Sequence, residues 1–185
     1  MSDMKQFSII KYENVKMVGD YNKYRFILEK EGRNKLVVLG VNPSVASDKE
    51  SDRTMVKVIG FAERNMDDNN KPFDGFLMLN LYPQRATDPD ALDNIRDERI
   101  HKENLIHIED YIKRIENPTI LLAFGNCIEK RDYLYTCFKE IVTIIEKYSP
   151  NWKNIGVTKQ GNPKHLTRAG YCEFQNFDLN DYLNK

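Results

Sequence analysis

Polar residues follow the first strongly apolar run of the sequence, in the segment "GVNPS" at residues 40–44. The proline after Asn42 keeps that asparagine out of the helical region and fixes the direction of the chain. A carboxamide held in this way can donate and accept hydrogen bonds at once, which suits the edge of a nucleobase or an attacking water. The same motif is also typical of a turn in which Asn42 bonds only its own backbone. Ser44 is a candidate ligand contact beside it.

A second polar group follows another apolar run, in "NLYPQRATDPDAL" at residues 80–92. Asn80 lies inside the apolar run, where an unpaired carboxamide costs about 1–3 kcal/mol and therefore needs a partner. Arg85 can bind a phosphate or carboxylate through two parallel hydrogen bonds, or it can brace neighbouring loops by pairing with an acid. The acids available for that pairing are Asp52, Asp88 and Asp97. Thr87 is a candidate ligand contact and also a candidate helix cap.

The third group is basic and occupies "VTKQGNPKHLTR" at residues 157–168. His165 lies there between Lys164 and Arg168, and histidine both titrates near neutral pH and binds ligands readily. Lys159, Lys164 and Arg168 can face phosphates, and a solvated basic surface is the alternative.

A glycine ends the apolar run "TILLAFG" at residues 119–125. Gly125 allows a ligand to approach the backbone closely, which makes Asn126 a further candidate ligand contact. We interpret Cys127 as a small buried residue rather than a nucleophile.

Apolar segments alternate with amphipathic ones along the chain, which predicts an α/β fold: a three-layer sandwich with a mostly parallel central sheet. Strands are expected at residues 24–31, 36–41, 75–82, 119–125 and 154–158, the first two pairing as a hairpin. Helices are expected at residues 51–65, 98–117, 132–148 and 178–183. The first is capped by Ser51 or Asp52, and the third is either one helix or a broken pair. Ligands bind such sheets outside the carboxyl ends of the strands. The loops that meet there are residues 42–53, 82–89, 125–131 and 159–168.

The composition argues against several classes of protein. The chain carries 28 basic and 28 acidic residues, a balance that disfavours coating nucleic acid by charge alone. No apolar run is long enough for a membrane span and no signal peptide is visible, so we expect one cytoplasmic domain over residues 1–185. Three widely spaced cysteines fit neither a disulfide framework nor a metal site. P-loop, dinucleotide, zinc-hydrolase and serine-elbow motifs are absent, so we expect no cofactor and no metal.

The ordered motifs "GVNPSVAS", "LNLYPQRATDPDAL", "LLAFGN" and "GVTKQGNPKH" resemble those of domain-of-unknown-function family 1643 from bacteria, phages and mobile elements. The resemblance covers about residues 24–168. It implies an architecture more than a reaction, because the family's activity is not established.

A weaker resemblance is to the uracil-DNA glycosylase superfamily, whose mismatch-specific branch carries Gly-Ile-Asn-Pro-Gly where this chain has Gly40 to Ser44. It implies a glycosylase-like fold in which Asn42 positions the water that attacks the sugar. A second glycosylase loop resembles "GNPKHLTR", so that Asn162 and His165 would correspond to its active-site residues. Ser44 stands where that branch has glycine.

The first hypothesis is therefore a protein that binds a nucleobase, nucleotide or nucleic acid in a cleft between these loops, at the carboxyl ends of the strands. If it is an enzyme, it is a glycosylase-like hydrolase with Asn42, Asp52 and His165 as catalytic residues. The expected ligand contacts are Ser44, Asn80, Arg85, Thr87, Asn126, Lys159, Lys164 and Arg168.

Two alternatives stay open. The first is a non-catalytic module of a phage or mobile element that binds nucleic acid or a host protein. Its binding patch would draw on Tyr133, Tyr135, Tyr148 and Trp152, for which core packing is the competing role. The second alternative is nucleotide hydrolysis or transfer with Mg²⁺ held by Asp48, Glu50 and Asp52.

Overall fold

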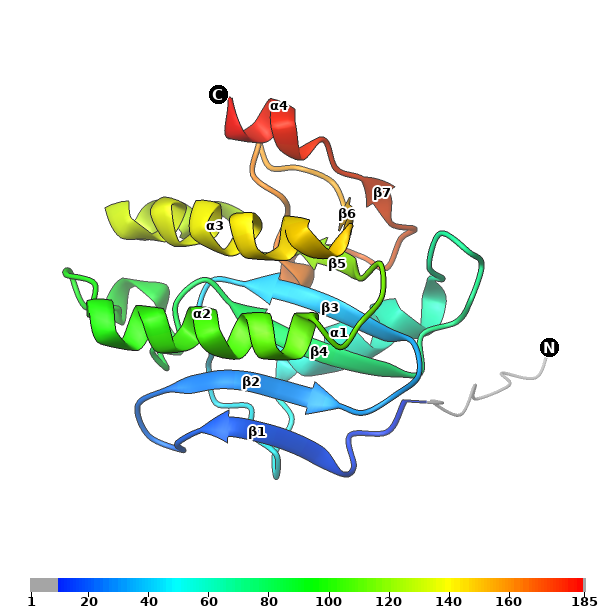
Figure 1. The fold of residues 1–185 in the computed structure, drawn as a ribbon, viewed down its shortest axis with the longest axis horizontal. Coiled ribbons are helices and arrows are strands. Elements are labelled where there is room, and N and C mark those ends of the chain that lie inside the picture. The colour runs from blue at the N-terminus through cyan, green and yellow to red at the C-terminus, as the bar shows by residue number, and fades with distance from the viewer. Residues whose placement is uncertain (1–9, 185) are drawn as a thin grey trace.

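A computed structural model describes residues 10–184, and these build one seven-stranded mixed sheet covered by helices on both faces (Figure 1). The strands are β1 (Val15–Gly19), β2 (Arg25–Lys30), β3 (Lys35–Gly40), β4 (Gly75–Asn80), β5 (Thr119–Leu122), β6 (Asn151–Asn154) and β7 (Gln175–Asn176). Their order across the sheet is β1-β2-β4-β3-β5-β6-β7. The central strands β4, β3, β5 and β6 run parallel, and the outer pairings are antiparallel. The α/β class and the mostly parallel centre are confirmed.

The helices form a layer on each side of the sheet. They are α1 (Arg53–Arg64), α2 (Glu98–Ile112), α3 (Asp132–Ile145) and α4 (Leu179–Leu183). In β3, Leu36 and Val38 pack on the α1 side, whereas Val37 and Leu39 pack against the core beneath α2 and α3. A strand covered on both faces needs apolar side chains at every position, which explains its continuous apolar run. No helix within residues 10–184 is long and apolar enough to cross a membrane.

Helix α1 begins as its sequence predicts. Asp52 is the N-cap, and its Oδ1 accepts a hydrogen bond from the backbone N–H of Met55 at 2.9 Å. Met55, Val58 and Phe61 are buried at helical spacing against the sheet. The cap and the apolar stripe together place Asp52 and Arg53 at the carboxyl end of β3.

The predicted hairpin of β2 and β3 is wrong, because β4 lies between them. The crossover through α1 returns β4 to the edge of β3 that a hairpin partner would have used. Asp74, just before β4, accepts hydrogen bonds from the backbone N–H groups of Arg33 (3.1 Å) and Asn34 (2.8 Å). A Cβ on Gly32 would lie 2.8 Å from the backbone of Gly75, so this connection passes β4 only with glycine there.

The strand predicted at residues 154–158 is also displaced. Strand β6 ends at Asn154, whose Oδ1 accepts a hydrogen bond from Gly156 N–H at 2.6 Å. Gly156 has a φ of 101°, which turns the chain away from the sheet. Residues 157 and 158 therefore enter the loop that carries His165.

Candidate functional site

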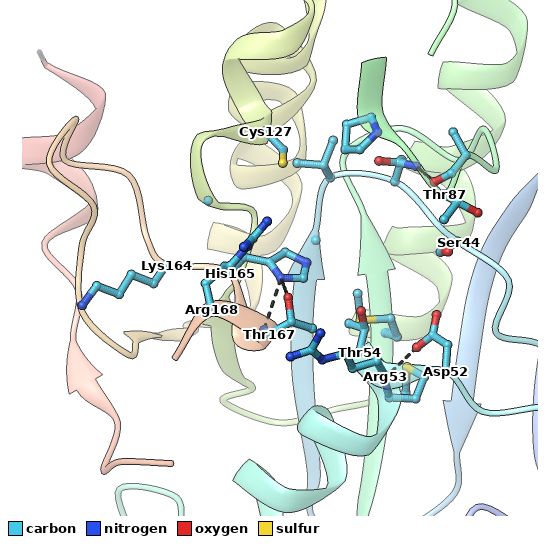
Figure 2. Close-up of a pocket in the computed structure, with 18 of the residues that line it drawn as sticks. Ser44, Asp52, Arg53, Thr54, Thr87, Cys127, Lys164, His165, Thr167 and Arg168 are labelled. Carbon is cyan, nitrogen blue, oxygen red and sulfur yellow. Dashed lines mark hydrogen bonds between the residues drawn. The ribbon is translucent and has the colours of Figure 1, made fainter. Parts of the chain in front are cut away.

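A cavity of about 630 Å³ opens at the carboxyl ends of the central strands. Gly40 at the end of β3, Met78 in β4 and Gly125 after β5 contribute to its wall. The predicted candidates that line it are Asn42, Ser44, Asp52, Thr87, Asn126, Lys164, His165 and Arg168. Figure 2 shows His165, Thr167 and Arg168 on one side, with Ser44, Thr87 and Asp52 across from them. The other predicted candidates, Asn80, Arg85 and Lys159, do not line the cavity.

Most of the charged side chains that line the cavity are positive. Arg25, Arg53, Lys164 and Arg168 are its cations, and Asp52 is its carboxylate. The Lys164 side chain packs against Gly156 and extends away from the other labelled residues (Figure 2). The arginines therefore dominate the positive field inside the cavity.

His165 is held as a hydrogen-bond donor. Its Nδ1 accepts a hydrogen bond from Thr167 N–H at 3.3 Å and lies 2.8 Å from Thr167 Oγ1 (Figure 2). Burial, and then the nearby Arg168, lower the pKa of His165, while Asp52 opposes them. A neutral imidazole that accepts at Nδ1 carries its proton on Nε2. The free ring nitrogen therefore offers a proton to a ligand and cannot act as a base in this tautomer.

The carboxamide of Asn42 joins two of the loops. Its Nδ2 donates to the carbonyl of Ala86 at 2.7 Å and to that of Pro43 at 3.2 Å. The interpretation that Asn42 bonds only its own local backbone is therefore wrong. Its Oδ1 accepts no hydrogen bond from residues 10–184, so the atom left for a ligand or water is an acceptor.

Arg85 braces the loops, and it does so through carbonyls rather than through the predicted acids. Its guanidinium donates to the backbone oxygens of Asp20 (2.9 Å), Ser44 (2.8 Å) and Ala46 (3.2 Å). Asp52, one of the expected partners, instead caps α1. Because these carbonyls occupy Arg85, it supports the cavity wall from behind.

Asn80 is fully buried at the end of β4, directly across from Gly40. Neither atom of its carboxamide has a hydrogen-bond partner among the described residues. A Cβ on Gly40 would lie 3.3 Å from Asn80 Oδ1 and 2.9 Å from Met78 Cε. Gly40 lines the cavity, so the absence of a side chain there leaves Asn80 just behind the wall.

Asn126 and Asn162, two of the predicted candidates, support the loop that carries His165. Asn126 Oδ1 accepts from Thr158 Oγ1 (2.7 Å) and Asn162 Nδ2 (3.1 Å), and its Nδ2 donates to Gln160 Oε1 (2.9 Å). Asn162 is buried and also accepts a hydrogen bond from the Tyr182 hydroxyl at 2.7 Å. Both amides are therefore occupied in holding the loop in place. Lys159, in the same loop, is exposed.

The sequence analysis missed Arg25, which is only 2% exposed and lines the cavity. Its Nη1 donates to the carbonyl of Ala46 at 2.9 Å, and its Nε has no partner among residues 10–184. Burial, together with the nearby Arg85, lowers the pKa of Arg25 to about 10, so it stays protonated at neutral pH. An arginine that opens the apolar run "RFIL" was the available signal.

Two other side chains bear on the chemistry. Cys127 lines the cavity half-buried, and burial raises the pKa of its thiol, which keeps it protonated at neutral pH. The Mg²⁺ site expected from Asp48, Glu50 and Asp52 does not form. No group of three histidine, cysteine or acidic side chains in the described part of the chain could hold a metal. Asp48 instead accepts a hydrogen bond from the Tyr21 hydroxyl at 2.8 Å.

Comparison with known proteins assigns the chain to a family. A family model described as "Protein of unknown function (DUF1643)" matches residues 25–165. The match begins at Arg25 and ends at His165, so it spans both sides of the cavity. No curated protein and no solved structure matches the chain.

Proposed function

The chain belongs to the DUF1643 family of proteins of unknown function, and we propose that its cavity binds a nucleotide or another phosphate-bearing derivative of a nucleobase. The observation that carries the proposal is the charge of the lining, in which Arg25, Arg53 and Arg168 face a single carboxylate, Asp52. Guanidinium groups bind phosphate oxygens through charge-assisted hydrogen bonds. A cavity with this excess of cations favours an anionic ligand over a neutral one.

The size and the neutral lining support the same class of ligand. A volume of about 630 Å³ falls in the range of small-molecule and cofactor sites. Ser44 and Thr87 offer hydroxyls, and Asn42 offers a free carbonyl oxygen.

The competing proposal, a module that binds a host protein through an aromatic patch, has less support. Tyr133, Tyr135 and Tyr148 pack against the core of the α2 and α3 face, and Trp152 is part of that core. These residues therefore do not form the exposed patch that such a module requires.

Thermal unfolding with added ligands tests the proposal. A ligand at a hundredfold excess over its Kd stabilises the folded chain by about 2.7 kcal/mol. We expect mononucleotides to raise the Tm of the parent, and to raise that of Arg168→Gln by less. Arg99→Gln is the matched control, because Arg99 is exposed on α2 and does not line the cavity. Equal shifts in all three proteins would place the ligand elsewhere, and no shift with any nucleotide or base would refute the proposal.

A second candidate function is hydrolysis of an N-glycosidic bond, which the resemblance to uracil-DNA glycosylases also suggests. Two acceptors on the cavity wall favour it: Asn42 Oδ1 and the Asp52 carboxylate oxygen that does not cap α1. Together they can orient a water whose oxygen bonds to the sugar carbon as its proton passes to Asp52. The base leaves with the electron pair of the carbon–nitrogen bond, and His165 Nε2–H donates a hydrogen bond to it.

Chromatography of nucleosides, nucleotides and oligonucleotides after incubation with the protein separates catalysis from binding. Hydrolysis predicts free base from the parent, and strongly reduced release from Asn42→Ala and Asp52→Asn. Intact recovery of a ligand that stabilises the protein would identify a binding protein without this activity.

A further inference from the structure

Arg25 differs from the other cations of the cavity because it is buried. Arg53 and Arg168 are exposed at the surface, whereas Arg25 is 2% exposed. A buried charge is expected to have a charged or hydrogen-bonded counterpart, since its desolvation costs several kcal/mol. No carboxylate of residues 10–184 forms an ion pair with Arg25, whose hydrogen-bond partner is the carbonyl of Ala46.

A second arginine increases the unbalanced charge at this place. Arg85 Nη1 also donates to Ala46 O, at 3.2 Å, so both guanidinium groups converge on one carbonyl oxygen. The other partners of Arg85 are two backbone carbonyls and the sulfur of Met17. Two neighbouring cations that share a neutral acceptor create a local field that favours an anion.

The free edge of Arg25 has the shape that an oxyanion requires. Nη1 is used on Ala46, and Nε and Nη2 donate to no described residue. The Nε–H group and one N–H group of Nη2 lie in the guanidinium plane and point in parallel from the same edge, so they can bind two oxygens of one phosphate or carboxylate. Arg25 lines the cavity, and its Nε atom is buried, so an oxyanion at this edge would lie at the wall of the cavity and out of contact with solvent.

We propose that Arg25 is an inner oxyanion subsite, which selects ligands whose buried end carries a terminal phosphate or carboxylate. This inference rests on the proposed function and narrows it to mononucleotides or similar small phosphomonoesters, rather than neutral nucleosides or a base turned out of a polymer. The exposed Arg53 and Arg168 would then contact the outer part of the ligand.

Thermal unfolding and calorimetry at constant ionic strength test the subsite with inorganic phosphate, acetate, AMP, adenosine and an oligonucleotide without terminal phosphates. We expect phosphate and AMP to stabilise the parent, and adenosine and the oligonucleotide to have little effect. Acetate decides whether a carboxylate can replace phosphate at the subsite. In Arg25→Met we expect AMP to bind roughly 10- to 100-fold more weakly, the factor for loss of hydrogen bonds to a charged group. Arg99→Met should bind AMP as the parent does.

The unliganded variant separates a ligand subsite from a structural role. Because Arg25 is buried without an ion-paired acid, its replacement by an apolar side chain of similar length should leave the Tm unchanged or raise it. A lower Tm in Arg25→Met with an unaltered response to phosphate would overturn the proposal.

The NMR signal of Arg25 Nε–H in the parent provides a second measurement that needs no folded variant. Phosphate should shift this signal, and an unchanged signal at saturating AMP would also overturn the proposal. If adenosine and AMP stabilise the parent equally while phosphate has no effect, the inner subsite is refuted and the nucleobase cavity stands. If none of these compounds binds, both proposals fail.

Discussion

Asp52 has two roles in the structure, and two substitutions separate them. One carboxylate oxygen caps α1 by accepting the Met55 N–H at 2.9 Å, and the same side chain supplies the negative charge of the cavity. Asp52→Ala removes the cap and the charge. Asp52→Asn removes the charge and keeps a capping oxygen, because asparagine caps helices about as well as aspartate.

The expected magnitudes follow from the cap. Loss of an N-cap side chain costs about 0.5–2 kcal/mol, typically near 1 kcal/mol. For a chain of 150–250 residues, each kcal/mol lowers the Tm by about 2–4 °C. Both variants remove the electrostatic attraction between Asp52 and Arg25, so the difference in Tm between the two variants measures the contribution of the cap alone. We therefore expect Asp52→Ala to unfold about 2–4 °C below Asp52→Asn at pH 7.

Thermal and urea unfolding, followed by circular dichroism at constant ionic strength, give the two stabilities. The cavity charge gives an independent readout: Asp52→Asn should bind inorganic phosphate more tightly than the parent, since the repelling carboxylate is gone. Equal Tm values for the two variants would refute the capping role. Weaker phosphate binding by Asp52→Asn would refute the electrostatic account of the cavity.

Three further predictions concern the cavity wall and its supports. Gly40→Ala should lower stability by at most about 1 kcal/mol, because the atom that the new Cβ would approach at 2.9 Å is Cε, at the flexible end of the Met78 side chain. A much larger fall in Tm would show that Met78 cannot move aside. The lowered pKa of His165 means that the unfolded chain binds its proton first as pH falls, so the folded state loses stability below about pH 6.5. His165→Gln should make the unfolding free energy less dependent on pH between about 7 and 5, and an unchanged slope would contradict this assignment. Tyr182→Phe leaves the buried Oδ1 of Asn162 without its 2.7 Å donor and should cost about 1–3 kcal/mol in urea unfolding, whereas a neutral effect would mean that water replaces the hydroxyl.

The places of the candidate residues along the chain were predictable because they depend on local patterns. The apolar runs that became β3, β4 and β5 ended where glycine and polar residues began. Asp52 was recognisable as a cap because capping needs only the residues of the first helical turn. Since parallel strands end at one edge of a sheet, the loops after them were expected to meet there, and most of the candidates do line one cavity.

The partners of those residues were not predictable, because they come from distant segments. Arg85 lies 65 residues from Asp20, whose carbonyl it binds, and Asn162 lies 36 residues from Asn126. No local pattern indicates which hydrogen bonds a side chain finds across such separations. Arg85, Asn126 and Asn162 therefore looked like ligand contacts in the sequence, and the structure uses them as supports.

By itself the sequence determined the type and order of most elements, the cap of α1 and the edge of the sheet at which polar residues collect, since these depend on periodicity and neighbouring residues. The tertiary structure decided the strand order, which placed β4 rather than β3 beside β2. It also decided the state of Arg25, because its burial without an ion-paired carboxylate arises only when β2, the Ala46 loop and Arg85 come together. An unbalanced charge is a property of distances between segments, and those distances exist only in the folded chain.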